Sequence, residues 1–344
     1  MKRNPKLEEV ASLAGVSIMT VSRVVNNSGR VSESTRQKVL QAIKEVNYQP
    51  NVIARSLAKN KTNILGLVVY KQESMHPAFY NEIINGVLEG ASEQGYDLLI
   101  FAHNDEESYS SRITQSGLVD GVVFMGISPN KQDLISVHDK NFPYMFIGKR
   151  EVEGVEQYFI SPDYIAGTEK ATEYLIERGH TKIGFIGQSR MIEPDRDKLL
   201  GYQKALYQHH VVYNPHLVFE ESQSQSDGYK AMKELLVHKP TAVVLNNTYT
   251  TLGAIMAIKE AGLRIPEDIS VIGFDDNEEL NQQFNDFIGI ELTALQIPKQ
   301  KLGKEAAKLA ISLIEGREIP EENYMNLVFL QKNSCLELKQ VETQ

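Results

Sequence analysis

The sequence has one cysteine and no tryptophan among its 344 residues. The single cysteine, Cys335, excludes an internal disulfide and any zinc site built from several cysteines. No apolar run approaches the roughly 20 residues that a membrane-spanning helix needs. The N-terminal stretch MKRNPKLEEV has no apolar segment after its basic start, so it does not read as a secretory signal. We therefore expect a cytoplasmic protein without a membrane partner.

Motifs that carry enzyme chemistry are also missing. No G-x-G-x-x-G opens a helix, and no G-x-x-x-x-G-K-[ST] is present. The eight histidines are scattered without metal-ligand spacing, and His209-His210 fits a helix surface. Ser, His and Asp residues occur, but none in a nucleophile-elbow context. We expect no catalytic site, no metal and no cofactor.

What the chain does have is a 42% hydrophobic composition, which is enough for folded cores, and an uneven distribution of charge. Residues 1–62 hold 11 Lys and Arg against 4 Asp and Glu, whereas the remainder has 16 more acidic than basic residues. A basic head on an acidic body indicates contact with a polyanion. On charge alone, a solvated basic surface is the alternative.

Three short helices are predicted in the head. Asn4-Pro5 can start the first helix, and Gly15 can end it. Ser17 is expected to cap the second helix and Ser32 the third. Apolar residues recur at helical spacing along one face of each helix. These faces are Leu7, Val10, Ala11 and Ala14, then Val21, Val24 and Val25, then Val39, Leu40, Ile43 and Val46.

A helix, a tight turn containing Gly and a second helix form the helix-turn-helix pattern, in which the second helix enters the major groove. Ile18, Met19, Ser22 and Arg23 fall on the outward face of that helix. Arg23 can donate two hydrogen bonds to guanine, and exposed apolar side chains suit thymine methyl groups. The alternative is a three-helix core with a stray exposed isoleucine.

Residues 50–62, PNVIARSLAKNKT, follow the third helix. Pro50 and Asn51 can open a helix of two turns, with Ala54 and Leu57 on its apolar side. A helix this short is marginal in water, so it would need DNA and a partner chain. Leu57 could insert into a minor-groove base step. Local sequence alone favours a flexible linker over this helix.

From residue 63 apolar runs alternate with amphipathic segments. Continuous apolar runs are typical of parallel strands that are covered on both faces. Two successive series of this kind predict two doubly wound sheets with a cleft between them. The expected strands are 64–69, 96–101, 119–126, 144–148, 182–187, 217–219, 242–246 and 269–274. The expected helices lie around 79–91, 106–116, 163–178, 195–209, 226–237 and 249–262.

Several segments resemble the lactose/galactose repressor (LacI/GalR) family of bacterial transcription factors. LEEVASLAGVSIMTVSRVVN (7–26) is similar to its DNA-binding signature, and VSESTRQKVLQAIKEVNYQPNVIARSLA (31–58) to its third helix and hinge. GLVDGVVF, IERGHTKIGFIG, GLRIPEDISVIGFDD and LGKEAAKLAISLIEG resemble landmarks of its core. The resemblance implies an all-α helix-turn-helix head and an α/β core. That core would be two doubly wound parallel-sheet subdomains of periplasmic-binding-protein type, linked by three crossovers.

The implied domains are a DNA-binding head at 1–49, a hinge at 50–62, two core subdomains and a tail. The first subdomain would take residues 63–161 and 293–321, the second 162–292 and 322–331, and the tail 332–344. Tetrameric family members add a C-terminal helix with leucine heptads. Leu336 and Leu338, at spacing two, make no heptad seam. We therefore expect a homodimer.

The resemblance also implies residue roles in DNA binding. Recognition-helix and hinge positions that meet DNA are Ser17, Ile18, Met19, Thr20, Ser22, Arg23, Asn26, Asn51, Ala54 and Leu57. In this family the hinge leucine, here Leu57, enters the central base step of the operator.

Effector-binding positions implied by the resemblance are Phe79, Tyr80, Arg196, Lys198, Asn247 and Asp275. Lys198 stands where many members carry arginine, and Arg196 could substitute for it. Thr248 and Ile297 stand where Asp and Gln are frequent. Carboxylate, amide and cationic groups can share vicinal hydroxyls, and an aromatic ring can cover a sugar ring. The alternatives are that Asp275 caps a loop and that Phe79 belongs to the core.

We therefore expect a sequence-specific regulator, a repressor of carbohydrate-metabolism genes. It would bind a pseudo-palindromic operator in double-stranded DNA and respond to a small-molecule effector, a sugar, bound between the core subdomains. One alternative is a carbon-catabolite-type regulator controlled by a protein co-regulator. Another is a cytoplasmic sugar-binding or sugar-processing protein with an accessory head.

Overall fold

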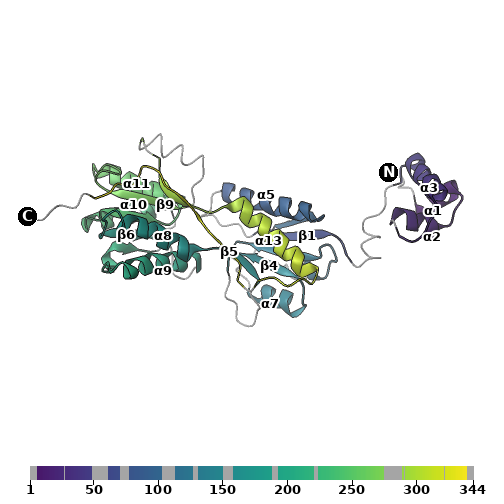
Figure 1. The fold of residues 1–344 in the computed structure, drawn as a ribbon, viewed down its shortest axis with the longest axis horizontal. Helices are drawn as coiled ribbons and strands as arrows, with labels where there is room; N and C mark the ends of the chain where they lie inside the picture. Colours follow the sequence, from purple (N-terminus) through teal and green to yellow (C-terminus); the bar gives the residue numbers. More distant parts are fainter. Residues whose placement is uncertain are drawn as a thin grey trace, which may run out of the picture. The chain divides into compact units, whose positions relative to one another are not determined.

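The computed structural model divides the chain into two compact units, residues 1–63 and 64–344. The first unit is an all-α head and the second an α/β body (Figure 1). Among the described residues, every helix is too short or too polar to span a lipid bilayer. The structure describes residues 6–26, 28–48, 61–69, 77–102, 113–126, 131–149, 158–187, 193–220, 224–274, 289, 291–320 and 322–338.

The head contains three helices, α1 (Leu7–Ala14), α2 (Ile18–Val25) and α3 (Glu33–Val46). Their core is built from the side chains of Val10, Ala11, Val21, Val24, Val39, Ala42 and Tyr48. The expectation that Leu40 belongs to this core is wrong, because its side chain is 40% exposed. Val39, Ala42, Ile43 and Val46 already form the stripe at helical spacing, and Leu40 lies one residue off it.

Local capping chemistry sets where these helices begin and end. Ser17 Oγ accepts a 3.2 Å hydrogen bond from the Thr20 N–H. Ser32 Oγ likewise accepts one of 3.3 Å from the Thr35 N–H. Gly15 follows α1 with φ of 66°, a left-handed conformation that glycine adopts without a Cβ clash. The N-cap of α1 is Lys6, without a side-chain cap bond, and the predicted Asn4-Pro5 start lies outside the described residues.

The first sheet of the body has the order β11-β5-β4-β3-β1-β2, and its described strand pairs are parallel. Its strands are β1 (Ile64–Val69), β2 (Asp97–Ala102), β3 (Gly121–Met125), β4 (Tyr144–Ile147), β5 (Phe159–Pro162) and β11 (Tyr324–Met325). We call this sheet, with α5 (Pro77–Glu93), α7 (Lys131–Asp139) and α13 (Lys299–Ile314), the first lobe. Two short strands of this sheet were not predicted from the sequence: β5, which ends at proline, and β11. Most of the expected helix at 106–116 lies outside the described residues.

The second sheet has the order β12-β10-β9-β8-β6-β7 and is parallel except for β12, which pairs antiparallel with β10. Its strands are β6 (Ile183–Ile186), β7 (Val218–Phe219), β8 (Ala242–Leu245), β9 (Ser270–Phe274), β10 (Thr293–Gln296) and β12 (Val328–Leu330). With α8 (Tyr164–Ile176), α9 (Glu193–Gln208), α10 (Gln225–Val237), α11 (Thr248–Glu260) and the 3₁₀ turn η1 (Pro215–Leu217), it forms the second lobe. The doubly wound, two-sheet prediction is confirmed.

The chain passes between the two lobes three times. It leaves β5 for α8 at Asp163, β10 for α13 at 297–298, and β11 for β12 at 326–327. Two expected boundaries are therefore displaced, because residues 293–296 pair in the second sheet and residues 324–325 in the first. Pro298 lies within the second crossover, and proline has no N–H with which to extend a strand ladder.

Residues 332–338 also belong to the body, so the expectation of a tail from residue 332 is wrong. Ser334 Oγ accepts a 2.8 Å hydrogen bond from the Thr293 N–H and donates one of 2.6 Å to the Val271 carbonyl. The Leu338 N–H donates to the Arg178 carbonyl at 2.8 Å. Cys335 is buried beside Ser334. Polar backbone groups of β9, of β10 and of the turn after α8 find partners in this segment, which holds it against the second lobe.

Candidate functional site

The outward face of α2 carries apolar side chains in contact with solvent. Ile18 is 48% and Met19 68% exposed, while Val21 and Val24 on the opposite face are buried in the head. Arg23 is exposed beside them. The predicted division of this helix into a core face and an outward face is confirmed. Because burying apolar side chains away from water lowers the free energy, this face is suited to contact with a partner surface.

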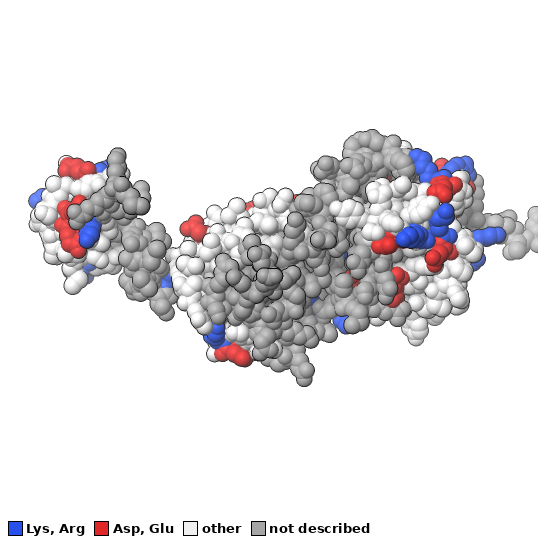
Figure 2. Space-filling model, turned by 180° about the vertical axis from the view of Figure 1, so that it is seen from behind, with Lys and Arg blue, Asp and Glu red and all other residues white. Residues whose placement is uncertain are grey.

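The surroundings of α2 favour a polyanionic partner. Residues 10–32 contain no Asp or Glu, and Arg23 and Arg30 lie within this stretch. Gly29, at φ of 72°, lies beside the stem of Arg23, because a Cβ there would be 3.4 Å from Arg23 Cδ, an ordinary contact distance. On the face drawn in Figure 2, the second lobe instead shows basic and acidic side chains intermingled. An acid-free helix with an exposed arginine fits contact with phosphates and base edges.

A second site is built around a buried lysine of the second lobe. Lys198 Nζ donates a 3.2 Å hydrogen bond to the Asn246 carbonyl and lies 3.9 Å from Asp195 Oδ1. It also lies 4.0 Å from the ring centroid of Phe274 and 5.0 Å from that of Tyr164. We call these five residues the Lys198 cluster. Its cation is held by a carboxylate, a carbonyl and two aromatic faces.

Asparagine side chains extend this cluster. The Asn246 Nδ2 donates a 2.7 Å hydrogen bond to Asp195 Oδ1, and Asn246 Oδ1 is buried with no partner among the described residues. Asn247 caps α11 by accepting a 2.9 Å hydrogen bond from the Thr250 N–H at its Oδ1. The Asn247 Nδ2 is buried and has no partner in the same part of the chain. Burial raises the pKa of Asp195, and the nearby Lys198 opposes that shift.

The first lobe places an aromatic pair at the start of α5. The rings of Phe79 and Tyr80 meet edge to face with 5.8 Å between centroids. Lys299 Nζ lies 6.0 Å from the Phe79 ring centroid and 3.5 Å from Glu82 Oε1. Lys299 is buried, so this lobe too contains a buried lysine with a carboxylate partner.

Chain connectivity shows which edge of each sheet points to the other lobe (Figure 1). β5 ends at Pro162 in the first sheet, and α8 begins in the second lobe at Tyr164. β10 ends at Gln296 in the second sheet, and α13 begins in the first lobe at Lys299. Since β5 is parallel to β4 and β11, and β10 is parallel to β9, the carboxyl edge of the parallel strands in each sheet is the edge toward the other lobe. In open parallel sheets that edge is where ligands bind.

The structure brings some of the predicted effector residues together and separates others. Lys198 and Asn247 lie at the carboxyl edge of the second sheet, and Phe79 and Tyr80 at the start of α5. Arg196 is outside the cluster, with an exposed side chain 3.9 Å from Asp197. Asp275 and the hinge residues Asn51, Ala54 and Leu57 lie outside the described residues.

Sequence reasoning missed four members of the cluster: Tyr164, Asp195, Asn246 and Phe274. Spacing offered one indication, because Asp195 precedes Lys198 by three residues on the same helix face. The other three approach Lys198 only through the tertiary fold. Within the described residues, no group of three or more His, Cys, Asp and Glu is arranged to hold a metal ion.

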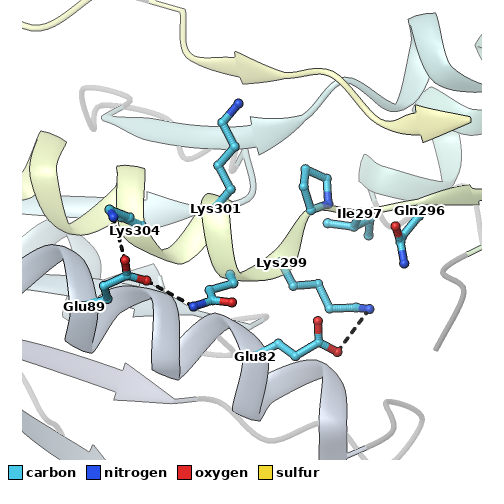
Figure 3. Close-up of a pocket in the computed structure, with 9 residues that line it drawn as sticks. Glu82, Glu89, Gln296, Ile297, Lys299, Lys301 and Lys304 are labelled. Carbon is cyan, nitrogen blue, oxygen red and sulfur yellow. Dashed lines mark hydrogen bonds and ion pairs between the residues drawn. The ribbon is translucent and has the colours of Figure 1, made fainter. Parts of the chain in front are cut away.

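A pocket of about 400 Å³ lies along α5 and α13 of the first lobe, and Figure 3 shows its lining. Two lysines of α13, Lys299 and Lys304, pair with Glu82 and Glu89 of α5 across it. Lys304 Nζ lies 2.6 Å from Glu89, which also accepts a 3.1 Å hydrogen bond from Gln300. None of the six predicted effector residues lines it. Its ion pairs join the helices.

Two parts of the chain match known protein families. Residues 6–51 match the family described as bacterial regulatory proteins, lacI family, and residues 172–331 match the periplasmic binding protein-like domain. The HTH-type transcriptional repressor PurR of Mannheimia succiniciproducens is 34% identical over 325 residues, covering 92% of this chain and 94% of that protein.

Two solved structures are similar over nearly the whole chain. The lac repressor dimer bound to operator and the anti-inducer ONPF has a TM-score of 0.80 at 26% identity, covering 97% of this chain and 100% of that one. The transcriptional regulator CelR in complex with cellobiose has a TM-score of 0.68 at 29% identity, covering 96% and 100%.

A helix-turn-helix head joined to a periplasmic-binding-protein-like body defines a DNA-binding transcriptional regulator. This chain belongs to the lacI family of bacterial regulatory proteins.

Proposed function

We propose that the chain is a homodimeric repressor of carbohydrate-metabolism genes, which binds a pseudo-palindromic operator and is controlled by a sugar. The observation that carries the DNA-binding part is the outward face of α2, where Ile18 and Met19 are exposed in an acid-free stretch. The similar proteins are regulators, which supports a body that binds its effector without converting it.

The proposed DNA contacts divide into two groups. The head would contact base edges and phosphates through Ser17, Ile18, Met19, Thr20, Ser22, Arg23 and Asn26. The hinge would contribute Asn51, Ala54 and Leu57, with Leu57 inserted into the central base step. Base-edge contacts specify the sequence, whereas phosphate contacts position the protein.

A dimer follows from the form of the operator. Two half-sites about one helical turn apart call for two heads that are related by a two-fold axis. The similar lac repressor structure is of a dimer on its operator, which supports the same assembly here.

The proposed effector site joins Lys198, Asn247 and Asp275 of the second lobe to Phe79 and Tyr80 of the first. Donors, acceptors and aromatic faces in one place suit a sugar, and the similar CelR was solved with cellobiose. A ligand held by both lobes favours one lobe orientation over others. Since β1 of the first lobe begins at Ile64, two residues after the proposed hinge, that orientation can change the separation of the two hinges in the dimer.

The coupling required is modest. About 1–3 kcal/mol changes operator affinity by about 5–150-fold. The test is a gel shift with DNA from upstream of the protein's own gene, repeated with each sugar that raises the melting temperature. A sugar at about 100 times its Kd should stabilise the protein by about 2.7 kcal/mol. Failure to shift any such DNA, or operator binding that responds to a protein and to no sugar, would contradict the proposal.

A further inference from the structure

Both buried lysines of the described residues have a carboxylate within 4 Å. Lys198 Nζ lies 3.9 Å from Asp195 Oδ1, and Lys299 Nζ lies 3.5 Å from Glu82 Oε1. The first pair is enclosed, because Asp195 and Lys198 are both buried. The cationic group at the proposed effector site is therefore accompanied by an anion from the same helix, and the pair carries no net charge.

We propose that Asp195 makes this site selective for uncharged polyhydroxyl ligands and against carboxylates and phosphates. The proposal rests on the function proposed above and names the chemical class of its effector. A lysine without a counter-ion would attract an anionic ligand strongly in a desolvated site. With Asp195 in place, an anion that approaches Lys198 also approaches a carboxylate.

Asn246 and Asn247 provide uncharged hydrogen-bonding groups at this site. Because Asn246 Nδ2 faces Asp195, the orientation of that amide is fixed, and its buried Oδ1 is an acceptor with no partner in the described part of the chain. Because Asn247 Oδ1 caps α11, the amide orientation of Asn247 is also fixed. Its buried Nδ2 is a donor that likewise has no partner in the described part of the chain. Buried polar atoms need partners.

One acceptor and one donor on consecutive residues match a ligand whose groups both donate and accept. A hydroxyl does both, whereas a carboxylate or a fully ionised phosphate only accepts. Asn246 Oδ1 would be left facing such an acceptor without a hydrogen bond, and an unpaired buried polar group is costly. Charge and hydrogen-bond pattern therefore favour the same class, a neutral sugar or polyol.

The experiment compares matched probes by isothermal titration calorimetry on the full-length protein. The neutral probes are glucose, galactose, ribose and cellobiose. The anionic probes are glucuronate, galacturonate and ribose 5-phosphate, each an anionic derivative of one of the neutral sugars. We expect at least one neutral probe to bind more tightly than its anionic partner, by about tenfold or more, as one unfavourable close charge contact would cause.

Asp195→Asn tests whether this carboxylate is responsible. It keeps an oxygen for Asn246 Nδ2 but leaves Lys198 without its anion, so the preference should fall by about tenfold or reverse. The double variant Asp195→Asn/Lys198→Gln removes both charges at once, leaves no uncompensated ion and should retain a preference for the neutral probe. Glu169→Gln is the matched control, because Glu169 pairs with another lysine of α9, Lys204, at the surface (2.8 Å). It should bind the probes like the wild type.

The outcomes separate the two proposals. An anionic probe that binds the wild type more tightly than its neutral partner overturns the selectivity and leaves a sugar-controlled repressor intact. An unchanged preference in a folded Asp195→Asn protein overturns the role of Asp195. If Asp195→Asn does not fold, the double variant decides, since its loss of preference for the neutral probe would contradict the proposal. Absence of binding by every probe would contradict the proposed sugar effector, and the proposed selectivity would then be contradicted as well.

Discussion

Gly303 lies so close to Ile83 that a Cβ at position 303 would be 2.1 Å from the Ile83 carbonyl oxygen. This contact joins α13 to α5, and Gly86 and Gly90 allow the same close approach from the other helix. The two helices come from opposite ends of the body sequence and form one layer of the first lobe (Figure 1). Since the obstructing atoms belong to the backbone, a side chain at 303 can be accommodated only by moving a helix.

Gly303→Ala should therefore destabilise the body, by about 1–3 kcal/mol or more, although alanine favours helix formation. Urea unfolding followed by circular dichroism measures this. Lys301→Ala, at an exposed position of the same helix, should change the free energy of unfolding by no more than about 0.5 kcal/mol. Equal stability of the two variants would show that the helices separate freely.

Arg23→Ala should weaken binding to the operator by about 1–3 kcal/mol per subunit, if its guanidinium contacts guanine in bidentate fashion. Binding to random DNA should change much less. Lys38→Ala removes the same charge from α3, outside the recognition helix, and should affect both DNAs alike. Fluorescence anisotropy on the two duplexes gives the four affinities. A similar loss on both duplexes for Arg23→Ala would reduce its role to phosphate contact.

Leu57→Ala should weaken operator binding while effector binding stays unchanged, because the proposed wedge contacts only DNA. Anisotropy and calorimetry on the same preparation measure the two affinities. Unaltered affinity for the operator would contradict the proposed insertion of Leu57 into the base step.

Asn247 has two tasks that substitutions can separate. Asn247→Asp retains the oxygen that caps α11 and should keep most of the stability, but it removes the Nδ2 donor and should weaken effector binding. Asn247→Ala should lose effector binding and also about 0.5–2 kcal/mol of stability. Thermal melts with and without the effector distinguish the variants. An Asn247→Asp protein that binds effector as the wild type does would place the ligand elsewhere.

Acidification should destabilise the body through His180. Burial lowers the pKa of His180, whose Nδ1 accepts from Thr241 Oγ1 (2.9 Å) and whose Nε2 donates to the Leu336 carbonyl (3.1 Å). The unfolded histidine takes up a proton near pH 6.5, while the folded one resists it. Stability from this group is therefore complete above about pH 6.5 and declines as the pH falls below it.

The free energy of unfolding, measured in urea at several pH values, should decrease from pH 7.5 to 5.5. His180→Gln should reduce that slope, whereas His210→Asn, at an exposed histidine with positive φ, should leave it unchanged. A slope that survives in His180→Gln would assign the effect to other groups.

The head could be predicted almost wholly from its sequence because its determinants are local. Ser17, Ser32 and Gly15 act within three or four residues, and the valine faces follow helical spacing. Leu40 shows the limit of this reasoning, since several apolar residues compete for one narrow stripe. Eight strands of the body were equally apparent as apolar runs, but β5, whose four residues end in proline, and the short strands β10, β11 and β12 were not predicted.

The Lys198 cluster could be predicted only in part. The hydrogen bond from Asn246 to Asp195 joins residues 51 positions apart, and the local sequence around either residue does not predict the other as its partner. The packing of residues 332–338 against the body could not be predicted for the same reason, because their partners, Val271 and Thr293, are distant in sequence and are brought to them by the sheet. The Lys198 position was found through family resemblance, which could not say what surrounds it.

Three passages of the chain between the lobes have a consequence for synthesis on the ribosome. The first lobe takes its outer strand β11 and its covering helix α13 from beyond residue 298, after the whole second sheet except β12. Nascent domains generally fold in order of emergence, but here the earlier lobe stays unfinished until the later one has left the exit tunnel. Its nascent form exposes the apolar face that α13 will cover, and a ribosome-associated chaperone would meet that face first.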